Sequence, residues 1–263
     1  MSKVSIIMPT YNNGQYISSA IKSVLSQSFQ DFELLVIDDG SNDDTAKIVS
    51  KFNDQRIIYV RNLENKGLIY SLNLGLNQAK GELIARLDAD DEWVDLFKLE
   101  KQVEMFDDKN LGLVGTFAKA IDENGKKLFL IKYPAQDKEI RNRILIENCF
   151  IHSSVLFNKR LALKCGGYNA SDKYVEDYAL WMRMGEKALF ANIPEIMVGY
   201  RINRKGETLT NNHEQILNNF KIIKACRNKY PNYIIAILKW GTRFLLANLL
   251  STKLYWKLKT IIK

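Results

Sequence analysis

Short apolar runs alternate with amphipathic segments along the first third of the chain. Each apolar run suits one buried strand, and each intervening segment repeats apolar residues every three to four positions, the spacing of a helix face. The expected strands cover residues 4–9, 32–37, 57–60 and 83–87. The expected helices cover residues 16–27, 43–51 and 68–79. This alternation predicts an α/β fold in which helices cover a parallel sheet.

The regular alternation stops after Trp93. The later patterns predict helices at residues 96–106, 138–147 and 178–187. They predict strands at residues 111–115, 117–121, 127–131 and 153–157. We therefore expect the second part of the body to be mixed, and to form the other wall of a cleft.

Three carboxylates, Asp88, Asp90 and Asp91, follow the fourth expected strand directly. Like charges this close repel and raise one another's pKa unless a cation sits among them. Oxygen ligands favour Mg²⁺ or Mn²⁺. The alternative is an acidic turn that caps the next helix. Asp38 and Asp39 end the second strand in the same way, and open parallel sheets bind ligands at the carboxyl ends of their strands.

Composition and motifs argue against several classes of protein. Hydrophobic residues make up 46% and charged residues 26% of the 263 residues, which is ordinary for a globular protein. The sequence has no G-x-G-x-x-G and no G-x-x-x-x-G-K-[ST], so a dinucleotide fold or a P-loop enzyme is disfavoured. Three scattered cysteines and two histidines make a zinc site improbable and suit a reducing cytosol. The N-terminus enters a strand directly, so no signal peptide is expected.

The net charge of +8 is concentrated near the C-terminus. Residues 215–263 hold ten of the 38 Lys and Arg residues and no acid, which leaves 28 bases and 30 acids in the first 214. The body is therefore not expected to bind nucleic acid.

The C-terminal segment predicts a helix at residues 215–229 and a second aromatic-rich helical region after Pro231. No apolar run reaches the roughly 18 residues of a membrane span. On a helical projection one side of this region is basic and carries Lys239, Arg243, Lys253 and Lys257. We expect helices that lie on an anionic membrane surface. The alternative is a helical hairpin that docks on the body or on a second subunit, so a homo-oligomer is possible.

Four motifs occur in order: V-S-I-I-M-P-T-Y-N at the N-terminus, F-E-L-L-V-I-D-D-G-S-N-D-D-T at 32–45, L-D-A-D-D at 87–91 and E-D-Y-A-L-W-M-R at 176–183. With them the chain resembles family 2 of the inverting glycosyltransferases. The resemblance implies a GT-A fold, with a mainly parallel central sheet flanked by helices. It implies one domain over 1–214, with a Rossmann-like nucleotide-sugar-binding half (1–92) and a mixed acceptor half (93–214). A basic helical tail (215–263) follows.

The resemblance also implies a donor site. Pro9, Thr10 and Tyr11 would shape the first loop, and Tyr11 could stack on the base. Asp39 would accept the N3–H of uracil, which favours a uridine donor; its alternative role is turn formation. Lys66 could contact phosphate or base, or be an ordinary surface charge.

The acidic cluster takes its roles from the same resemblance. Asp88 would lie at the ribose and the metal, Asp90 would bind Mn²⁺ or Mg²⁺ directly, and Asp91 would more often be a helix cap. Arg86 could contact phosphate or base, or lie on the surface. Where many members have a His, this chain has Asn203, so no histidine ligand is assigned.

The pair Glu176-Asp177 matches the family's general base, and Asp177 is the better candidate. Glu176 would support it or bind the acceptor. An acceptor hydroxyl is too weak an acid to ionise at neutral pH, so it needs such a base. The alternative is two acids favoured by a helix N-terminus.

The expected activity is inverting, metal-dependent transfer of a hexose or N-acetylhexosamine from a UDP-sugar to a hydroxyl of a glycan or lipid-linked acceptor. Transfer would be non-processive, because the Q-x-x-R-W motif is absent. It would serve cell-surface polysaccharide, lipopolysaccharide or another glycoconjugate, on the cytoplasmic face of the plasma membrane. The alternatives are a silent sugar-nucleotide-binding scaffold and a sugar nucleotidyltransferase.

Overall fold

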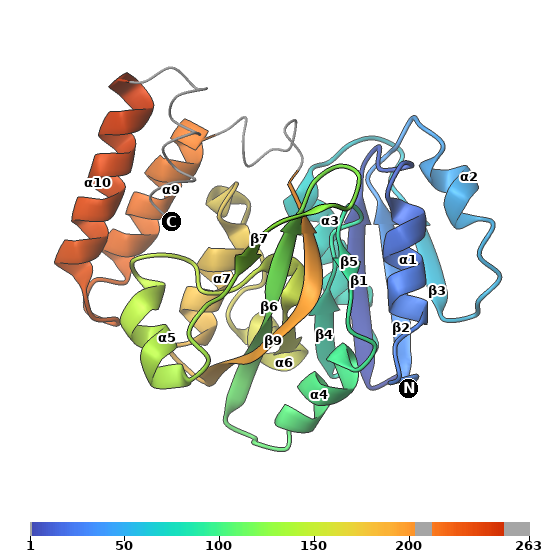
Figure 1. Ribbon diagram of the computed structural model, residues 1–263, viewed down its shortest axis with the longest axis horizontal. Helices are drawn as coiled ribbons and strands as arrows, with labels where there is room; N and C mark the ends of the chain where they lie inside the picture. Colours follow the sequence, from blue (N-terminus) through green and yellow to red (C-terminus); the bar gives the residue numbers. More distant parts are fainter. Residues whose placement is uncertain (1, 203–211, 250–263) are drawn as a thin grey trace.

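The computed structural model describes residues 2–202 and 212–249 (Figure 1). The described part contains a nine-stranded mixed sheet in the order β3-β2-β1-β4-β8-β6-β9-β5, with β7 paired to β6. Its first four strands are parallel and close to prediction: β1 (Val4–Thr10), β2 (Phe32–Asp38), β3 (Ile57–Arg61) and β4 (Leu83–Arg86). The predicted α/β fold is confirmed.

Successive residues of β1 point to opposite faces of the sheet, and a different helix covers each face. Ile6 and Met8 belong to the core beneath α1 (Ile17–Leu25), whereas Ile7 belongs to the core beneath α3 (Leu68–Gln78). A Cβ atom on Gly75 of α3 would lie 2.6 Å from the Ile7 side chain, so this glycine lets α3 approach the sheet closely. The short helix α2 (Thr45–Val49) lies at the edge, beside α1.

The second half joins the same sheet in mixed directions. Its strands are β5 (Glu92–Trp93), β6 (Leu111–Ile121), β7 (Lys127–Ile131), β8 (Leu156–Asn158) and β9 (Leu189–Arg201). Its helices are α4 (Lys98–Met105), α5 (Asp137–Ile144), α6 (Lys159–Lys164) and α7 (Glu176–Met184), with 3₁₀ turns at His152–Ser154 and Ala170–Asp172. The strand β8 is antiparallel to both β4 and β6 and thereby links the two halves.

Two predictions for this half are wrong, and one strand was missed. The expected strands 111–115 and 117–121 are one strand, β6, which continues through Thr116. The expected strand 153–157 begins as a 3₁₀ turn, because the hydroxyls of Ser153 and Ser154 are used in hydrogen bonds. The Ser154 hydroxyl donates to the nearby Ile151 carbonyl, and the Ser153 hydroxyl accepts from the distant Asp88 N–H. The long strand β9 was not predicted at all.

The helices α9 (Asn212–Ala225) and α10 (Tyr233–Leu249) form a hairpin at the edge of the molecule opposite to α1 and α2 (Figure 1). The hairpin docks on the body: Trp240 Nε1 donates to the Ile146 carbonyl at 3.0 Å, and Lys239 Nζ donates to Glu147 at 2.8 Å. Residues 250–263, with Lys253 and Lys257 of the predicted basic side, lie outside the described residues. No helix in 2–202 or 212–249 is long and apolar enough to cross a membrane.

Candidate active site

The strand order places a ligand-binding crevice at the carboxyl ends of β1 and β4. The chain passes from β1 to β2 on one side of β1 and returns from β3 to β4 on its other side. Ligands of open α/β sheets bind at such a reversal. The loops that meet there carry Thr10, Asp39 and Asp88, so the structure brings the predicted donor-site residues to one edge of the sheet.

Asp38 is a structural residue of the second loop. It is fully buried, accepts from the Ser41 backbone N–H at 2.8 Å and also accepts from the Tyr59 hydroxyl. The next turn requires Gly40, whose φ is +78° and where a Cβ atom would lie 2.8 Å from the Glu64 backbone. This loop is therefore built tightly against the segment that follows β3.

Asp39 is buried and already accepts three hydrogen bonds. Asn62 Nδ2 donates at 2.7 Å, the Lys66 N–H at 3.0 Å and the Gly67 N–H at 2.8 Å. The first two reach Oδ1 and the third reaches Oδ2, which keeps a second lone pair. Asp39 thus fastens the loop before α3 in place, a role that the sequence did not indicate, and retains one acceptor position.

The other predicted donor-site residues differ in their surroundings. Pro9 and Thr10 are buried, and Thr10 Oγ1 has no hydrogen-bond partner among the described residues. A buried hydroxyl without a partner is unfavourable unless a ligand supplies one. Tyr11 is exposed, as a stacking side chain must be. Lys66 is exposed as well, with its ammonium 5.1 Å from the centre of the Tyr70 ring.

Asp88 is held by two side chains. Arg86 Nη2 donates to its Oδ1 at 2.6 Å, and the Ser153 hydroxyl lies 3.1 Å from its Oδ2. Burial acts to raise the pKa of Asp88, but the Arg86 guanidinium, the neighbouring His152 and the hydrogen bonds from Arg86 and Ser153 together hold the pKa below its usual value. Asp88 is therefore an ionised carboxylate with a fixed orientation.

Arg86 lies in the core, not on the surface. Its side chain is fully buried, and it also donates to the Ile7 carbonyl at 2.6 Å and to His152 Nε2 at 3.0 Å. Tyr168 contacts the same nitrogen at 3.0 Å, and burial together with Arg86 lowers the pKa of His152 well below its usual value. His152 is thus a neutral acceptor that orients Arg86. An arginine inside the apolar run Leu83–Leu87 was the available signal for this role.

Asp91 is not a helix cap. The short strand β5 follows it, and no helix begins there. Its Oδ1 accepts from the Arg201 N–H at 2.7 Å, and its Oδ2 bonds the Ser153 hydroxyl. Burial and the neighbouring Asp90 and Asp88 raise the pKa of Asp91 well above its usual value. Asp91 therefore ties the acidic loop to β9.

Asp90, like Asp88, is open enough to bind a cation. Its side chain is partly exposed, and burial together with the charge of Asp88 raises its pKa to about 6. Arg201 does not neutralise its carboxylate by direct contact, since the Arg201 guanidinium donates to the carbonyls of Asp90, Asp122 and Glu123.

The acidic pair suits a metal that is shared with a ligand. Among the described residues no three His, Cys, Asp or Glu side chains are grouped so that they could hold a metal ion. Magnesium commonly uses only one or two carboxylates together with substrate phosphates and water. Asp88 and Asp90 supply such a pair, and a cation would relieve the repulsion that raises the pKa of Asp90. Asn203 lies outside the described residues.

Asp177 lies in the first turn of α7. Its Oδ1 accepts from the Tyr178 N–H at 2.6 Å, and its Oδ2 accepts from Asn148 Nδ2 at 2.9 Å. Burial raises the pKa of Asp177 to about 6, although the two hydrogen-bond donors act to lower it. The charges of Asp88 and Arg86 act on it too, so it lies near them; Glu176 beside it is buried.

Asn148 was not identified from the sequence. Its Oδ1 accepts from the Phe150 N–H at 3.1 Å, which turns its amide nitrogen toward Asp177. One segment, residues 148–153, thus carries groups that hold both Asp177 and the acidic loop. A polar residue before the apolar stretch at 149–151 was the only local signal.

Known proteins share these sequence patterns. The sequence model of the family Glycosyl transferase family 2 matches residues 5–167. The O-antigen biosynthesis glycosyltransferase WbnJ of Escherichia coli is 34% identical over 78% of this chain and 82% of its own length. A second E. coli protein, the UDP-Glc:alpha-D-GlcNAc-diphosphoundecaprenol beta-1,3-glucosyltransferase WfaP, is 28% identical over 95% of this chain and 97% of its own.

Solved structures share the fold. Residues 1–349 of TarS from S. aureus in complex with UDP-GlcNAc superpose with a TM-score of 0.72 at 22% identity, covering 92% of this chain and 72% of that one. The mannosyltransferase PcManGT of Pyrobaculum calidifontis, in complex with GDP-Man and Mn²⁺, gives 0.68 at 21% identity, covering 94% and 70%. The sheet and helices described above are therefore those of a fold already known with nucleotide sugars bound.

Proposed function

The chain belongs to glycosyl transferase family 2 and uses a nucleotide sugar, and on that premise we propose that it moves one hexose from a UDP-sugar to a lipid-linked acceptor with inversion. The observation that carries the proposal is the placement of Asp177. The charges of Asp88 and Arg86 act on the Asp177 carboxylate, whose pKa is raised by burial to about 6. One acid can then accept a proton while the others serve the leaving diphosphate.

The donor lies across the carboxyl ends of β1, β2 and β4. Tyr11 stacks on the base, and the free lone pair of Asp39 Oδ2 accepts the uracil N3–H. Thr10 Oγ1, which lacks a partner among the described residues, gains one from the nucleotide. Lys66, whose backbone N–H donates to Asp39, contacts phosphate with its exposed side chain.

Asp90 and Asp88 would hold Mn²⁺ or Mg²⁺. Such a cation would stabilise the charge that develops on the leaving nucleoside diphosphate. Arg86 keeps Asp88 ionised and fixed for this purpose, and Asp91 and Ser153 fix the loop that carries Asp90.

Asp177 removes the proton from the acceptor hydroxyl as that oxygen attacks the anomeric carbon. The new C–O bond forms while the bond from the anomeric carbon to the phosphate oxygen breaks, and the nucleoside diphosphate leaves with that electron pair. A single displacement inverts the configuration, so an α-linked donor gives a β-glycoside. Holding donor and acceptor in line supplies much of the rate by proximity.

The acceptor is a hydroxyl of a sugar linked to a membrane lipid through a diphosphate. The support is the E. coli relative WfaP, whose name describes transfer of glucose to GlcNAc-diphosphoundecaprenol with a β linkage. Such an acceptor places the enzyme on the cytoplasmic face of the plasma membrane, in O-antigen or related polysaccharide synthesis. Transfer of one sugar per encounter follows from the missing processive motif.

The test compares Asp177→Asn with the unchanged protein. We expect UDP-glucose to raise the melting temperature of both equally in the presence of Mn²⁺, and transfer to a synthetic GlcNAc-diphosphate lipid to fall by about 10³-fold or more in the variant. A screen of UDP-, GDP- and dTDP-sugars identifies the donor. If the variant keeps its transfer rate, Asp177 is not the base. If no nucleotide sugar is transferred by the unchanged protein, the silent-scaffold alternative is correct.

A further inference from the structure

The helix α10 is apolar on its outer face as well as its inner face. Its inner side packs on the body and on α9 through Ala236, Trp240 and Phe244. Its outer side is a stripe of exposed apolar residues that recur at helical spacing, and packing among the described residues does not account for them. Within the described residues their exposed fractions are large: Ile234 71%, Leu238 65%, Leu245 59% and Leu249 78%.

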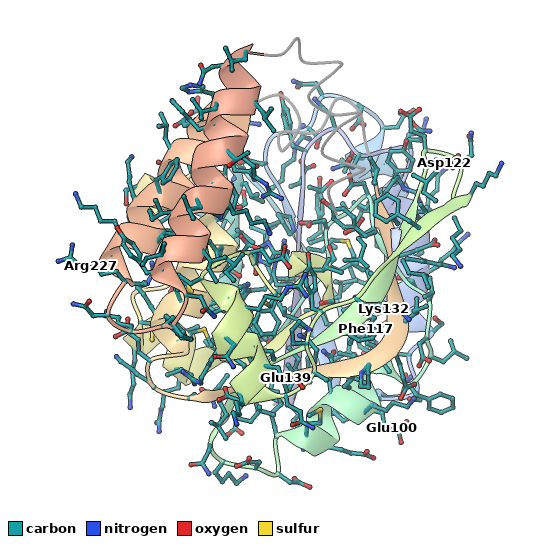
Figure 2. All side chains as sticks on the ribbon, turned by 60° about the vertical axis from the view of Figure 1, so that its left-hand side comes forward. Glu100, Phe117, Asp122, Lys132, Glu139 and Arg227 are labelled. Atoms are coloured by element: carbon teal, nitrogen blue, oxygen red, sulfur yellow. The ribbon has the colours of Figure 1, made fainter. Side chains whose placement is uncertain are left out.

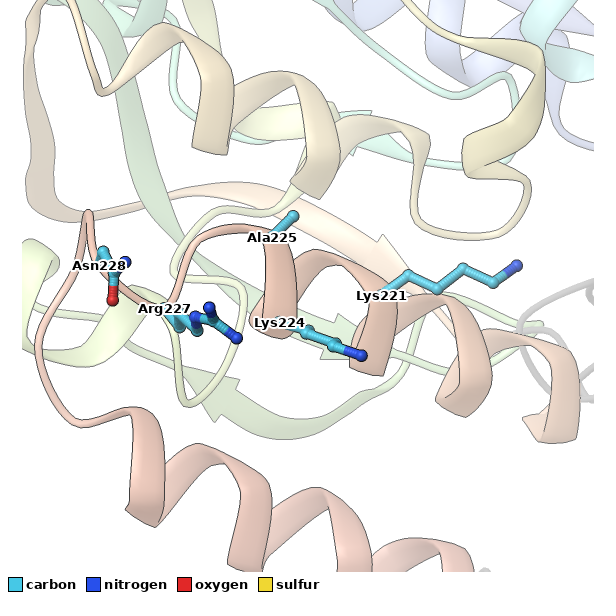
Figure 3. Close-up of a pocket in the computed structure, with 5 residues that line it drawn as sticks. All are labelled: Lys221, Lys224, Ala225, Arg227 and Asn228. Atoms are coloured by element: carbon cyan, nitrogen blue, oxygen red, sulfur yellow. The ribbon is translucent and has the colours of Figure 1, made fainter.

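A basic surface lies at the end of α9, where the chain turns toward α10. The three cations Lys221, Lys224 and Arg227 line an open hollow of about 540 Å³ at the end of α9 (Figure 3). Arg227 marks the outer edge of the hairpin in Figure 2. Within 2–202 and 212–249 none of the three has an acidic partner, in contrast to Lys229, which pairs with Glu186.

The helices α9 and α10 lie side by side, joined by the ring contacts of Phe244 with Phe220 and His213. Figure 1 shows α10 on the outer side of α9, away from the sheet. An apolar stripe together with a group of cations is the arrangement of an interfacial amphipathic surface. It offers apolar area for acyl chains and charge for phosphate headgroups.

We propose that this outer face, the Ile234-Leu238-Leu245-Leu249 stripe with Lys221, Lys224 and Arg227, seats the protein on an anionic phospholipid bilayer. The charge argues against a second copy as the occupant, because two such faces would bring like charges together. The assignment corrects the basic side expected from sequence: Lys239 is paired with Glu147, and Arg243 stacks on Trp240 at 4.8 Å. The proposed membrane-binding face extends the proposed function and rests on it, because the acceptor proposed there is linked to a membrane lipid.

The test measures co-sedimentation of the full-length protein with phosphatidylcholine vesicles, with and without phosphatidylglycerol. We expect binding only when phosphatidylglycerol is present. L238S/L245S should weaken it about tenfold per leucine, and K224Q/R227Q about fivefold per charge. The matched controls are L63S/L163S, which removes two exposed leucines elsewhere, and K51Q/K109Q, which removes two exposed lysines; both should bind like the unchanged protein.

Several results would overturn the assignment. One is equal binding by L238S/L245S and its control, and another is equal binding to vesicles with and without phosphatidylglycerol. A third is a stable dimer in solution that L238S/L245S dissociates, which would make the stripe a contact between copies. Failure of the proposed function looks different, because the protein would then bind vesicles through this face and yet transfer no sugar.

Discussion

The hydrogen bond from Asn148 to Asp177 allows the proposed base to be tuned without touching it. Asn148→Leu keeps a similar volume and removes the amide that donates to Asp177 Oδ2 at 2.9 Å. A hydrogen bond to a charged group contributes about 1.5 kcal/mol or more, and one pKa unit corresponds to about 1.4 kcal/mol. The variant should therefore raise the pKa of Asp177 by about one unit, from about 6 to about 7.

The sign of the effect on rate follows from the role of the base. Asp177 acts in its ionised form, so activity is lost as pH falls through its pKa, and a higher pKa moves this loss to higher pH. At pH 6 the ionised fraction should drop from about one half to about one tenth, a fivefold loss of kcat/KM. At pH 8 the ionised fraction, and hence the rate, should be nearly unchanged.

The assay measures the initial rate of transfer from a UDP-sugar between pH 5 and pH 9. The control is Asn110→Leu, because Asn110 is exposed and directly precedes β6. A merely structural role for Asn148 predicts an equal loss of rate at every pH. A uniform loss, or an acidic limb that does not move, would refute the assignment of Asp177 as a base that Asn148 holds.

Three further changes test other parts of the account. Gly75→Ala should lower the free energy of unfolding in urea by about 1–3 kcal/mol, because the new Cβ atom would collide with the Ile7 side chain. The control Gly241→Ala lies in open space on α10 and should be neutral or stabilising. Equal effects of the two substitutions would contradict the close approach of α3 to the sheet. Arg86→Met should destabilise the fold by about 1–3 kcal/mol in the same assay, because it leaves the Ile7 carbonyl and the partly exposed Asp88 carboxylate without their donor, and an unchanged stability would refute this pairing. Asp90→Ala should abolish the Mn²⁺-dependent part of the rise in melting temperature caused by UDP-sugar. A rise as large as that of the unchanged protein would show that Asp90 does not hold the metal.

The first half of the fold was predictable because its signals are local. Each parallel strand there is one continuous apolar run, and each helix shows its own amphipathic period. The strand β9 gave no such signal, since Pro194 and Glu195 interrupt its apolar pattern. What holds it is parallel pairing with β6, about 80 residues earlier in the chain, and that pairing bulges where the pattern breaks.

The positions of the site acids were predictable, but their partners were not. Acids after a strand end indicate a site, and Asp39, Asp88 and Asp90 do meet at one edge of the sheet. Whether a given acid is free depends on contacts between distant segments. Asp91 meets Arg201 across 110 residues, so its role as a tie to β9 could not be read from a motif that equally suits a helix cap.

The surface of α10 shows the same limit. A helical projection finds the basic side of the helix, but it does not say which side the body covers. The contact between Lys239 and Glu147 uses part of that basic side for docking, which leaves the apolar side outward.

The configuration of the first product tests the central claim most directly. Proton NMR of the sugar transferred from an α-linked UDP-hexose to a synthetic GlcNAc-diphosphate lipid reports the new anomeric linkage. The account predicts a β-glycoside, because one displacement assisted by Asp177 inverts the anomeric carbon. An α-glycoside would contradict it, since retention cannot result from a single attack by the acceptor from the face opposite to the diphosphate.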